Sequence, residues 1–142
     1  MYACAENENE KAGLIIFQNE DHYYFICISR EKDQPAIQLF QSVLIPRDGC
    51  RMKLLSNEIL PRLKNVELRI DCMLNSYSFN YRINGDQWKL LKNDVDAKFL
   101  STRVAGGFVG CVFGMYATSM GKPSSNVAKY FWFEYKGMDE LC

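Results

Sequence analysis

The chain has 142 residues, of which 48% are hydrophobic and 13% aromatic, enough for one domain with a core of its own. Its 17 basic and 17 acidic residues cancel. Neither nucleic acid nor an anionic membrane is therefore expected as a partner, because both attract clustered positive charge.

The six cysteines occur singly, without the CxxC spacing of a zinc or redox site. Several lie inside or beside apolar strand patterns, where cysteine acts as a small hydrophobic residue: Cys27, Cys50, Cys72 and Cys111. Buried reduced thiols are favoured over disulfides, as in a reducing compartment. The N-terminus lacks the pattern of a secretory signal, and no apolar run approaches the ~20 residues of a membrane span. We expect a cytoplasmic location.

The first strand-like segment, residues 12–17, follows a polar lead-in almost at once. Residues 22–29 are nearly all apolar or aromatic, which is typical of a strand covered on both faces. A weak helical pattern at residues 57–60 is ended by Pro61. Many short strands with turns between them predict an all-β sandwich or barrel.

The clearest alternation runs through residues 66–74, where Glu67, Arg69 and Asp71 point outward and apolar residues point to the core. Residues 77–83 continue it. Asn84 and Gly85 then supply the positive φ angles of a type I′ turn into residues 87–91.

Two features could carry chemistry, and each has a simpler explanation. Asn93, Asp94 and Asp96, in a predicted loop, could offer oxygens to calcium, but turn chemistry explains them equally well. His22, the single histidine, could act as a general base, but we predict a solvated turn residue. The nucleophile, phosphate-loop and dinucleotide motifs are absent, and the acidic residues are too scattered to suggest a catalytic pair.

Sugar binding is a further alternative. An outward polar row could hydrogen-bond sugar hydroxyls, although a solvated sheet face is the simpler interpretation: Glu67, Arg69, Asp71, Asn80, Arg82, Gln87 and Lys89. Four aromatic residues could stack on a sugar ring, although core packing is the default for them: Tyr23, Tyr24, Trp88 and Trp132.

The stretch at residues 105–117 reads AGGFVGCVFGMYA and places four glycines in an apolar strand pattern. Glycine in a strand usually marks a bend or the close approach of another group. We expect Gly110 and Gly114 to let neighbouring groups approach closely. Gly106 and Gly107 are expected to free the backbone just before Phe108. Residues 128–135 predict a closing strand.

These motifs resemble one family. AGLIIFQNE at residues 12–20, followed by Tyr23 and Tyr24, is similar to the AGL-x-x-F-Q-N run of the C-terminal β-sandwich of glycoside hydrolase family 43 β-xylosidases and α-L-arabinofuranosidases. The later landmarks follow in the family's order: YSFNY at 77–81, Trp88, VD at 95–96, LST at 100–102, GFVG at 107–110, GMYA at 114–117, Ala128 and WFEY at 132–135. The resemblance runs from about Glu8 to Gly137.

The resemblance implies that residues 1–142 form one antiparallel β-sandwich, a concanavalin-A-like jelly roll packed on a catalytic β-propeller that this chain lacks. The sandwich would be non-catalytic and need no cofactor. One of its loops would lend an aromatic side chain, Phe108, to the sugar pocket, with Gly107, Thr102 and Arg103 as neighbours in that region. Phe108 should then be more exposed than Phe113.

The sequence departs from the family in two respects. Lys129 and Phe131 stand where the family usually has acidic residues, which weakens the case for a metal. The family domain also carries further strands before the AGL motif, so we expect an N-terminally truncated copy. Exposed sheet edges would then pair with a second copy or with a separate propeller.

The leading interpretation is an accessory domain of a family 43 xylosidase or arabinofuranosidase, not an enzyme on its own. The alternative is a stand-alone carbohydrate-binding module for xylan-type oligosaccharides, with a xylo- or arabino-oligosaccharide as its ligand. A free-standing hydrolase ranks third.

Overall fold

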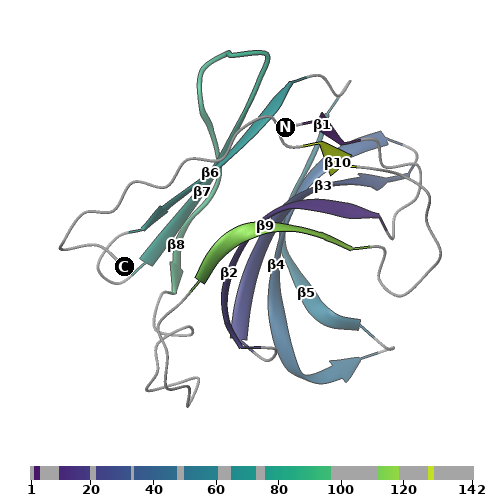
Figure 1. The fold of residues 1–142 in the computed structure, drawn as a ribbon, viewed down its shortest axis with the longest axis vertical. Helices are drawn as coiled ribbons and strands as arrows, with labels where there is room; N and C mark the ends of the chain where they lie inside the picture. Colours follow the sequence, from purple (N-terminus) through teal and green to yellow (C-terminus); the bar gives the residue numbers. More distant parts are fainter. Residues whose placement is uncertain are drawn as a thin grey trace.

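The computed structural model describes residues 2–3, 10–19, 22–32, 34–47, 50–60, 65–72, 76–96, 112–118 and 128–129. All regular structure in these ranges is β (Figure 1). The strands are β1 Tyr2–Ala3, β2 Lys11–Asn19, β3 His22–Glu31, β4 Gln34–Arg47, β5 Cys50–Ile59, β6 Val66–Cys72, β7 Ser76–Ile83, β8 Lys89–Asp96, β9 Val112–Thr118 and β10 Ala128–Lys129. The described residues include no helix long and apolar enough to cross a membrane.

The strands form two main sheets, and every pairing is antiparallel. One sheet has five strands in the order β5-β4-β3-β2-β9, and the other has three in the order β6-β7-β8. A short ladder joins β1 to β10. Figure 1 shows the five-stranded sheet strongly curved, with β6, β7 and β8 forming a separate layer beside it. The predicted all-β, antiparallel fold class is confirmed.

The main core lies between these sheets. The smaller sheet reaches across the larger one, because β6 approaches β2 and β8 approaches β5. Both layers contribute buried residues: Ala12, Ile16, Tyr24, Ile26, Ile28, Ile37, Leu39 and Leu60 from one side, and Val66, Tyr77, Phe79, Tyr81 and Val95 from the other. The Tyr24 ring meets the Tyr77 and Phe79 rings edge-on, with centroids 6.0 and 6.1 Å away.

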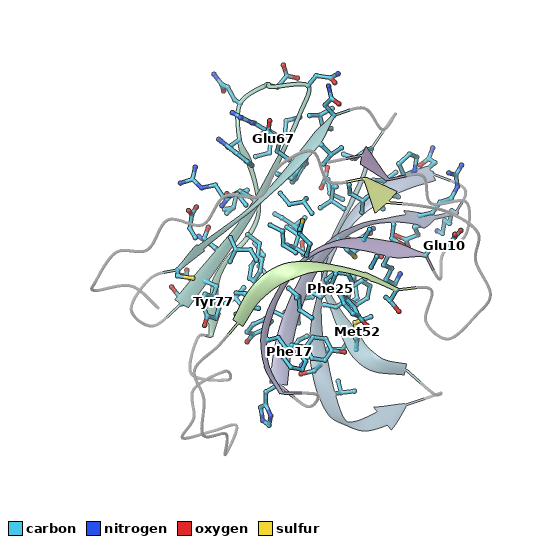
Figure 2. The ribbon with its side chains drawn as sticks, in the orientation of Figure 1. Glu10, Phe17, Phe25, Met52, Glu67 and Tyr77 are labelled. Carbon is cyan, nitrogen blue, oxygen red and sulfur yellow. The ribbon has the colours of Figure 1, made fainter. Side chains whose placement is uncertain are left out.

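A second apolar cluster covers the outer face of the five-stranded sheet. Phe25, Cys27, Phe40 and Met52 form it. Phe25 and Cys27 are fully buried, although they alternate along β3 with residues of the main core. The prediction that this strand is covered on both faces is therefore confirmed. Figure 2 shows Phe25 and Met52 on this sheet and Tyr77 on the smaller one.

The turn between β7 and β8 has the predicted geometry. Asn84 and Gly85 have φ angles of 54° and 75°, and the Asp86 N–H donates to the Ile83 carbonyl at 3.0 Å. Two successive positive φ angles under such a bond define a type I′ turn. The following strand begins at Lys89, two residues later than the sequence suggested, so Trp88 lies in the loop.

Two local predictions are wrong. Residues 57–59 continue β5 and are not helical, because they pair with β4 over a long ladder, and four residues are too few to nucleate a helix alone. Residues 93–96 belong to β8 and are not a loop. The register shifts between β7 and β8, and Asp94 takes a φ of 54°, so the irregularity is a bulge within the strand.

The close approach that glycine permits occurs at Gly13, which was not predicted. A Cβ there would lie 1.9 Å from the Ile26 carbonyl oxygen and 2.6 Å from Cys27 Cα. At Gly114 a Cβ would meet no atom of the described residues within 4 Å, so the predicted close contact is not found in that part of the chain. Gly110 lies outside the described residues.

Exposed large apolar side chains concentrate on strands at the sheet edges. Leu54 and Ile59 lie on β5, Met115 and Tyr116 on β9, and Leu90 on β8. Each of these strands is the last of its sheet in the described part of the chain. Edge strands with apolar side chains favour pairing with another chain.

Candidate functional site

The predicted pocket loop lies outside the described residues. This applies to Phe108, Gly107, Thr102 and Arg103, and the side chain of Phe113 is not described either. The structure describes the strand that follows, β9, which pairs with β2 along its whole length. The predicted role of Phe108, and its exposure relative to Phe113, stay predictions.

The candidate calcium ligands do not form a recognisable site. Asp94 is exposed on the β8 bulge, and Asp96 is the last residue of that strand. Among the described residues, no group of three or more His, Cys, Asp and Glu side chains could hold a metal ion. Nothing in the described geometry therefore adds to the weak case made by the sequence.

His22 is buried, with 8% of its surface exposed, and opens β3 opposite Asn19. The prediction of a solvated turn histidine is wrong. The strand begins at His22, as the apolar pattern indicated, and His22 already pairs with Asn19 of β2, so it belongs to the sheet and not to the turn before it.

Most of the predicted outward polar row lies on the outer face of the three-stranded sheet, but Gln87 lies in the β7–β8 loop. The outward prediction for Lys89 is wrong, because it pairs with Tyr81, which faces the core. Arg82 Nε donates to Glu67 Oε2 at 2.6 Å across the β6–β7 ladder. Arg69 Nε donates to Asp71 Oδ1 at 2.8 Å, along β6. Asn80 Nδ2 donates to Asp71 Oδ2 at 3.2 Å. We call this set the polar ladder; Figure 2 shows Glu67 on its sheet.

Trp88 joins the polar ladder from the β7–β8 loop. The Arg82 guanidinium lies 4.6 Å from the centre of the indole, and that of Arg69 lies 5.6 Å away. These are cation–π distances, and each contact stabilises an exposed pair by about 0.5–1 kcal/mol. Trp88 is thus half-buried under arginine side chains and is not a core residue.

The other predicted stacking aromatics have different surroundings. Tyr24 is buried in the main core, as expected by default. Tyr23 is half-buried, and its ring stacks on Phe17 with centroids 6.2 Å apart and planes inclined by 23°. Trp132 lies outside the described residues.

A polar chain that was not predicted crosses the outer face of the five-stranded sheet. Lys11 Nζ donates to Ser29 Oγ at 3.1 Å and to Gln38 Oε1 at 3.3 Å, and it lies 4.9 Å from the centre of the Phe40 ring. Gln38 Nε2 donates to Asn57 Oδ1 at 3.2 Å. The chain links β2, β3, β4 and β5, so only the register of four strands reveals it.

The two cysteines whose side chains the structure describes are of different kinds. Cys27 is a free thiol, and burial raises its pKa to about 12, with the nearby Lys11 charge acting in the opposite direction. An inert buried thiol is what the sequence predicted. Cys72, however, is disulfide-bonded, so the expectation of a reduced thiol is wrong there. A reducing compartment stays a prediction, and this disulfide weakens its premise.

Comparisons with known proteins agree on one family. Residues 1–136 match the family model described as the β-xylosidase C-terminal concanavalin A-like domain. A xylosidase/arabinosidase of Butyrivibrio fibrisolvens is 28% identical over 127 residues, covering 89% of this chain and 23% of that protein. The non-reducing end α-L-arabinofuranosidase BoGH43B of Bacteroides ovatus is 27% identical over 134 residues, covering 93% and 24% respectively.

Solved structures share the fold. The Bacteroides ovatus xyloglucan PUL protein GH43B superimposes with a TM-score of 0.73 at 24% identity, over 86% of this chain and 23% of its own. A GH43_12 protein retrieved from capybara gut metagenome gives 0.66 at 30% identity, over 77% and 21%. This chain therefore spans about a quarter of the length of these relatives.

Proposed function

The chain belongs to the family of C-terminal concanavalin A-like domains of β-xylosidases, and on that premise we propose that it is a non-catalytic accessory domain that packs on a family 43 catalytic β-propeller. One observation carries the proposal. About nine-tenths of this chain aligns with less than a quarter of each curated relative, as expected for one domain of a larger enzyme. The accessory role would be to support the catalytic domain and to shape its sugar pocket.

The finer part of the proposal is that Phe108 reaches the pocket of the catalytic domain. Two features support it. Gly106 and Gly107 precede Phe108 and give the backbone freedom to bend there. The nearby β9 is fixed to β2 from Val112 onward, which would give a presenting loop a firm base. Thr102 and Arg103 would be neighbours in the same region.

The test uses a chimera. The matched quarter of the Butyrivibrio fibrisolvens xylosidase/arabinosidase is replaced by this chain, and activity is measured on p-nitrophenyl xyloside and arabinofuranoside. Phe108→Ala should lower kcat/KM by about tenfold, because one apolar pocket contact contributes about 1–3 kcal/mol. Leu90→Ala, which removes an exposed apolar side chain on β8, is the control and should leave kcat/KM unchanged.

An active chimera in which Phe108→Ala has no effect would exclude the pocket role while leaving the accessory role intact. The isolated chain should hydrolyse neither substrate. Hydrolysis by the pure chain would instead make it a free-standing hydrolase and overturn the whole proposal.

Without a catalytic partner, the exposed apolar residues of the edge strands favour a homo-oligomer. Leu54 and Ile59 line one edge of the five-stranded sheet, and Met115 and Tyr116 line the other. Light scattering across a range of concentrations should show a dimer or larger species. A monomer at every concentration would contradict pairing through these edges.

The alternative is a carbohydrate-binding module. The specific observation in its favour is the polar ladder with Trp88, because aromatic and hydrogen-bonding side chains on one sheet face suit a sugar. The chimera separates the two functions, since a stand-alone module would bind xylo-oligosaccharides without supporting the activity of a catalytic domain.

A further inference from the structure

The polar ladder holds two guanidinium groups against one indole. Arg69 and Arg82 come from different strands, β6 and β7, yet both lie within 6 Å of the Trp88 ring centre. Each is also tied to a carboxylate through its Nε atom. Two fixed contacts per guanidinium restrict its rotamers, so less conformational entropy is lost when a ligand binds.

The polar ladder keeps unused hydrogen-bonding groups. Within the described part of the chain, the Nη atoms of Arg69 and Arg82 have no recorded partner, because only Nε is engaged in each pair. Asn80 uses its amide nitrogen, donating to Asp71 and Ser78, and its carbonyl oxygen has no recorded partner there. Donors and acceptors therefore stand side by side on a partly exposed sheet face.

The charges of the polar ladder decide which ligand it suits. Glu67 and Asp71 balance Arg69 and Arg82, so the surface has no net charge to attract an anion. A ligand carboxylate or phosphate would also approach Glu67 and Asp71, which are fixed beside the arginines, and like charges repel. A sugar hydroxyl both donates and accepts, and it meets no such repulsion.

We propose that the outer face of the three-stranded sheet, at Arg69, Arg82, Asn80 and Trp88, binds a neutral oligosaccharide. The Nη donors and the Asn80 carbonyl hydrogen-bond its hydroxyls. Trp88 is a positioning residue that holds both guanidinium groups in place. This binding needs no catalytic partner, and it would hold whether or not Phe108 shapes a pocket, so the chimera experiment and this one fail independently.

The experiment is a calorimetric titration of the full chain with two probes, xylohexaose and a xylo-oligosaccharide that carries a glucuronic acid branch. Xylohexaose should give saturable heat, and the acidic probe should bind no more tightly. Arg82→Gln should weaken xylohexaose binding by about tenfold, the effect of losing one charge-assisted hydrogen bond. Trp88→Ala should weaken it by about the same factor, because both guanidinium groups lose the ring that holds them in place. Arg69→Gln, at the more exposed guanidinium, should weaken it by about threefold.

Two controls separate binding from folding. Lys53→Gln alters an exposed cation on β5, away from the polar ladder, and should leave the affinity unchanged. Trp88→Phe keeps an aromatic face for the arginines and should retain most of the affinity, which a simple packing defect would not. Thermal unfolding of each variant is measured alongside, and Arg69→Gln remains informative if Arg82→Gln does not fold.

Three results would overturn the proposal. They are the absence of saturable heat with xylohexaose, an affinity that is the same in Arg69→Gln and Trp88→Ala as in the parent chain, and tighter binding of the acidic probe. The last result would show that the arginines, and not the balanced surface, select the ligand.

Discussion

The two sheets present opposite surfaces on their outward faces. The outer face of the five-stranded sheet buries Phe25 and Cys27 completely, whereas the outer face of the three-stranded sheet carries the polar ladder. The sequence patterns of the two strands predict this difference. Continuous apolar residues along β3 leave no solvated side, and strict alternation along β6 leaves one. The five-stranded sheet is therefore apolar on both faces along β3, whereas the three-stranded sheet has one apolar face and one polar face.

The largest effects are expected when one buried aromatic ring is removed from each of the two apolar clusters that lie on opposite faces of β3. Phe25 lies in the outer cluster and Phe79 in the main core, and neither is exposed. Each change to alanine should lower the free energy of unfolding by about 3–5 kcal/mol in urea titration. A loss below about 1 kcal/mol for Phe25→Ala would show that the outer cluster is not a second core.

The next effect concerns the packing of β2. Gly13→Ala should lower the free energy of unfolding by about 3 kcal/mol, because the new Cβ would collide with the backbone of β3. Gly114→Ala is the matched control on β9, where the space is open, and should raise it by about 0.5 kcal/mol. Equal effects in chemical denaturation would contradict the close approach at Gly13.

The outer cluster should also make stability depend on alkaline pH. In the unfolded chain Cys27 ionises near its ordinary pKa of 9.0, whereas burial in the fold raises that pKa to about 12. The folded state therefore binds the proton more tightly, so the free energy of unfolding should be constant below pH 9 and fall progressively as pH rises from 9 to about 12.

The control for this pH effect is Cys27→Ala, which removes the thiol. Its free energy of unfolding should decline less steeply over the same pH range, whatever its absolute stability. The raised pKa of Tyr81, caused by burial and then by the Glu58 charge, contributes to the decline in both proteins. Identical slopes would mean that Cys27 is not shielded from solvent.

The smallest effect is expected on the polar face. Glu67→Gln removes the charge that pairs with Arg82 and should lower the free energy of unfolding by about 0.5–1 kcal/mol, and by less at high salt. Denaturant titrations at two salt concentrations measure this. A loss above about 2 kcal/mol would indicate that the polar ladder contributes to stability as the outer apolar cluster does, which would contradict the expected difference between the two sheets.

The sequence was informative wherever one strand or one turn decides the structure. The apolar run at β3, the alternation at β6 and the Asn84-Gly85 turn were all predicted from local pattern and confirmed. The family resemblance was confirmed as well. The outward residues of β6 and β7, including Arg69 and Arg82, were also located correctly, because a period of two fixes which side each residue takes. Lys89 was not, because the register shifts between β7 and β8 place it opposite Tyr81.

What could not be predicted depends on how separate strands meet. The contact at Gly13 depends on the path of β3, and the Lys11 polar chain depends on the register of four strands. The positive φ at Asp94 accompanies a shift in the register between β7 and β8, and no residue pattern near Asp94 predicts that shift. Trp88 meets Arg82 only because the loop after the type I′ turn returns to the sheet.

The pairing of β1 with β10 joins Tyr2 to Lys129, and β2 meets β9 from Lys11 to Thr118. Contacts so distant in sequence form slowly, because a long loop must close before they contribute any stability. During synthesis, one edge of β2 would stay unpaired until β9 had left the ribosome. The folding of this sandwich should therefore be completed only after β9 and β10 have been translated, and a pause just before β9 would leave the edge of β2 open to pairing with another chain.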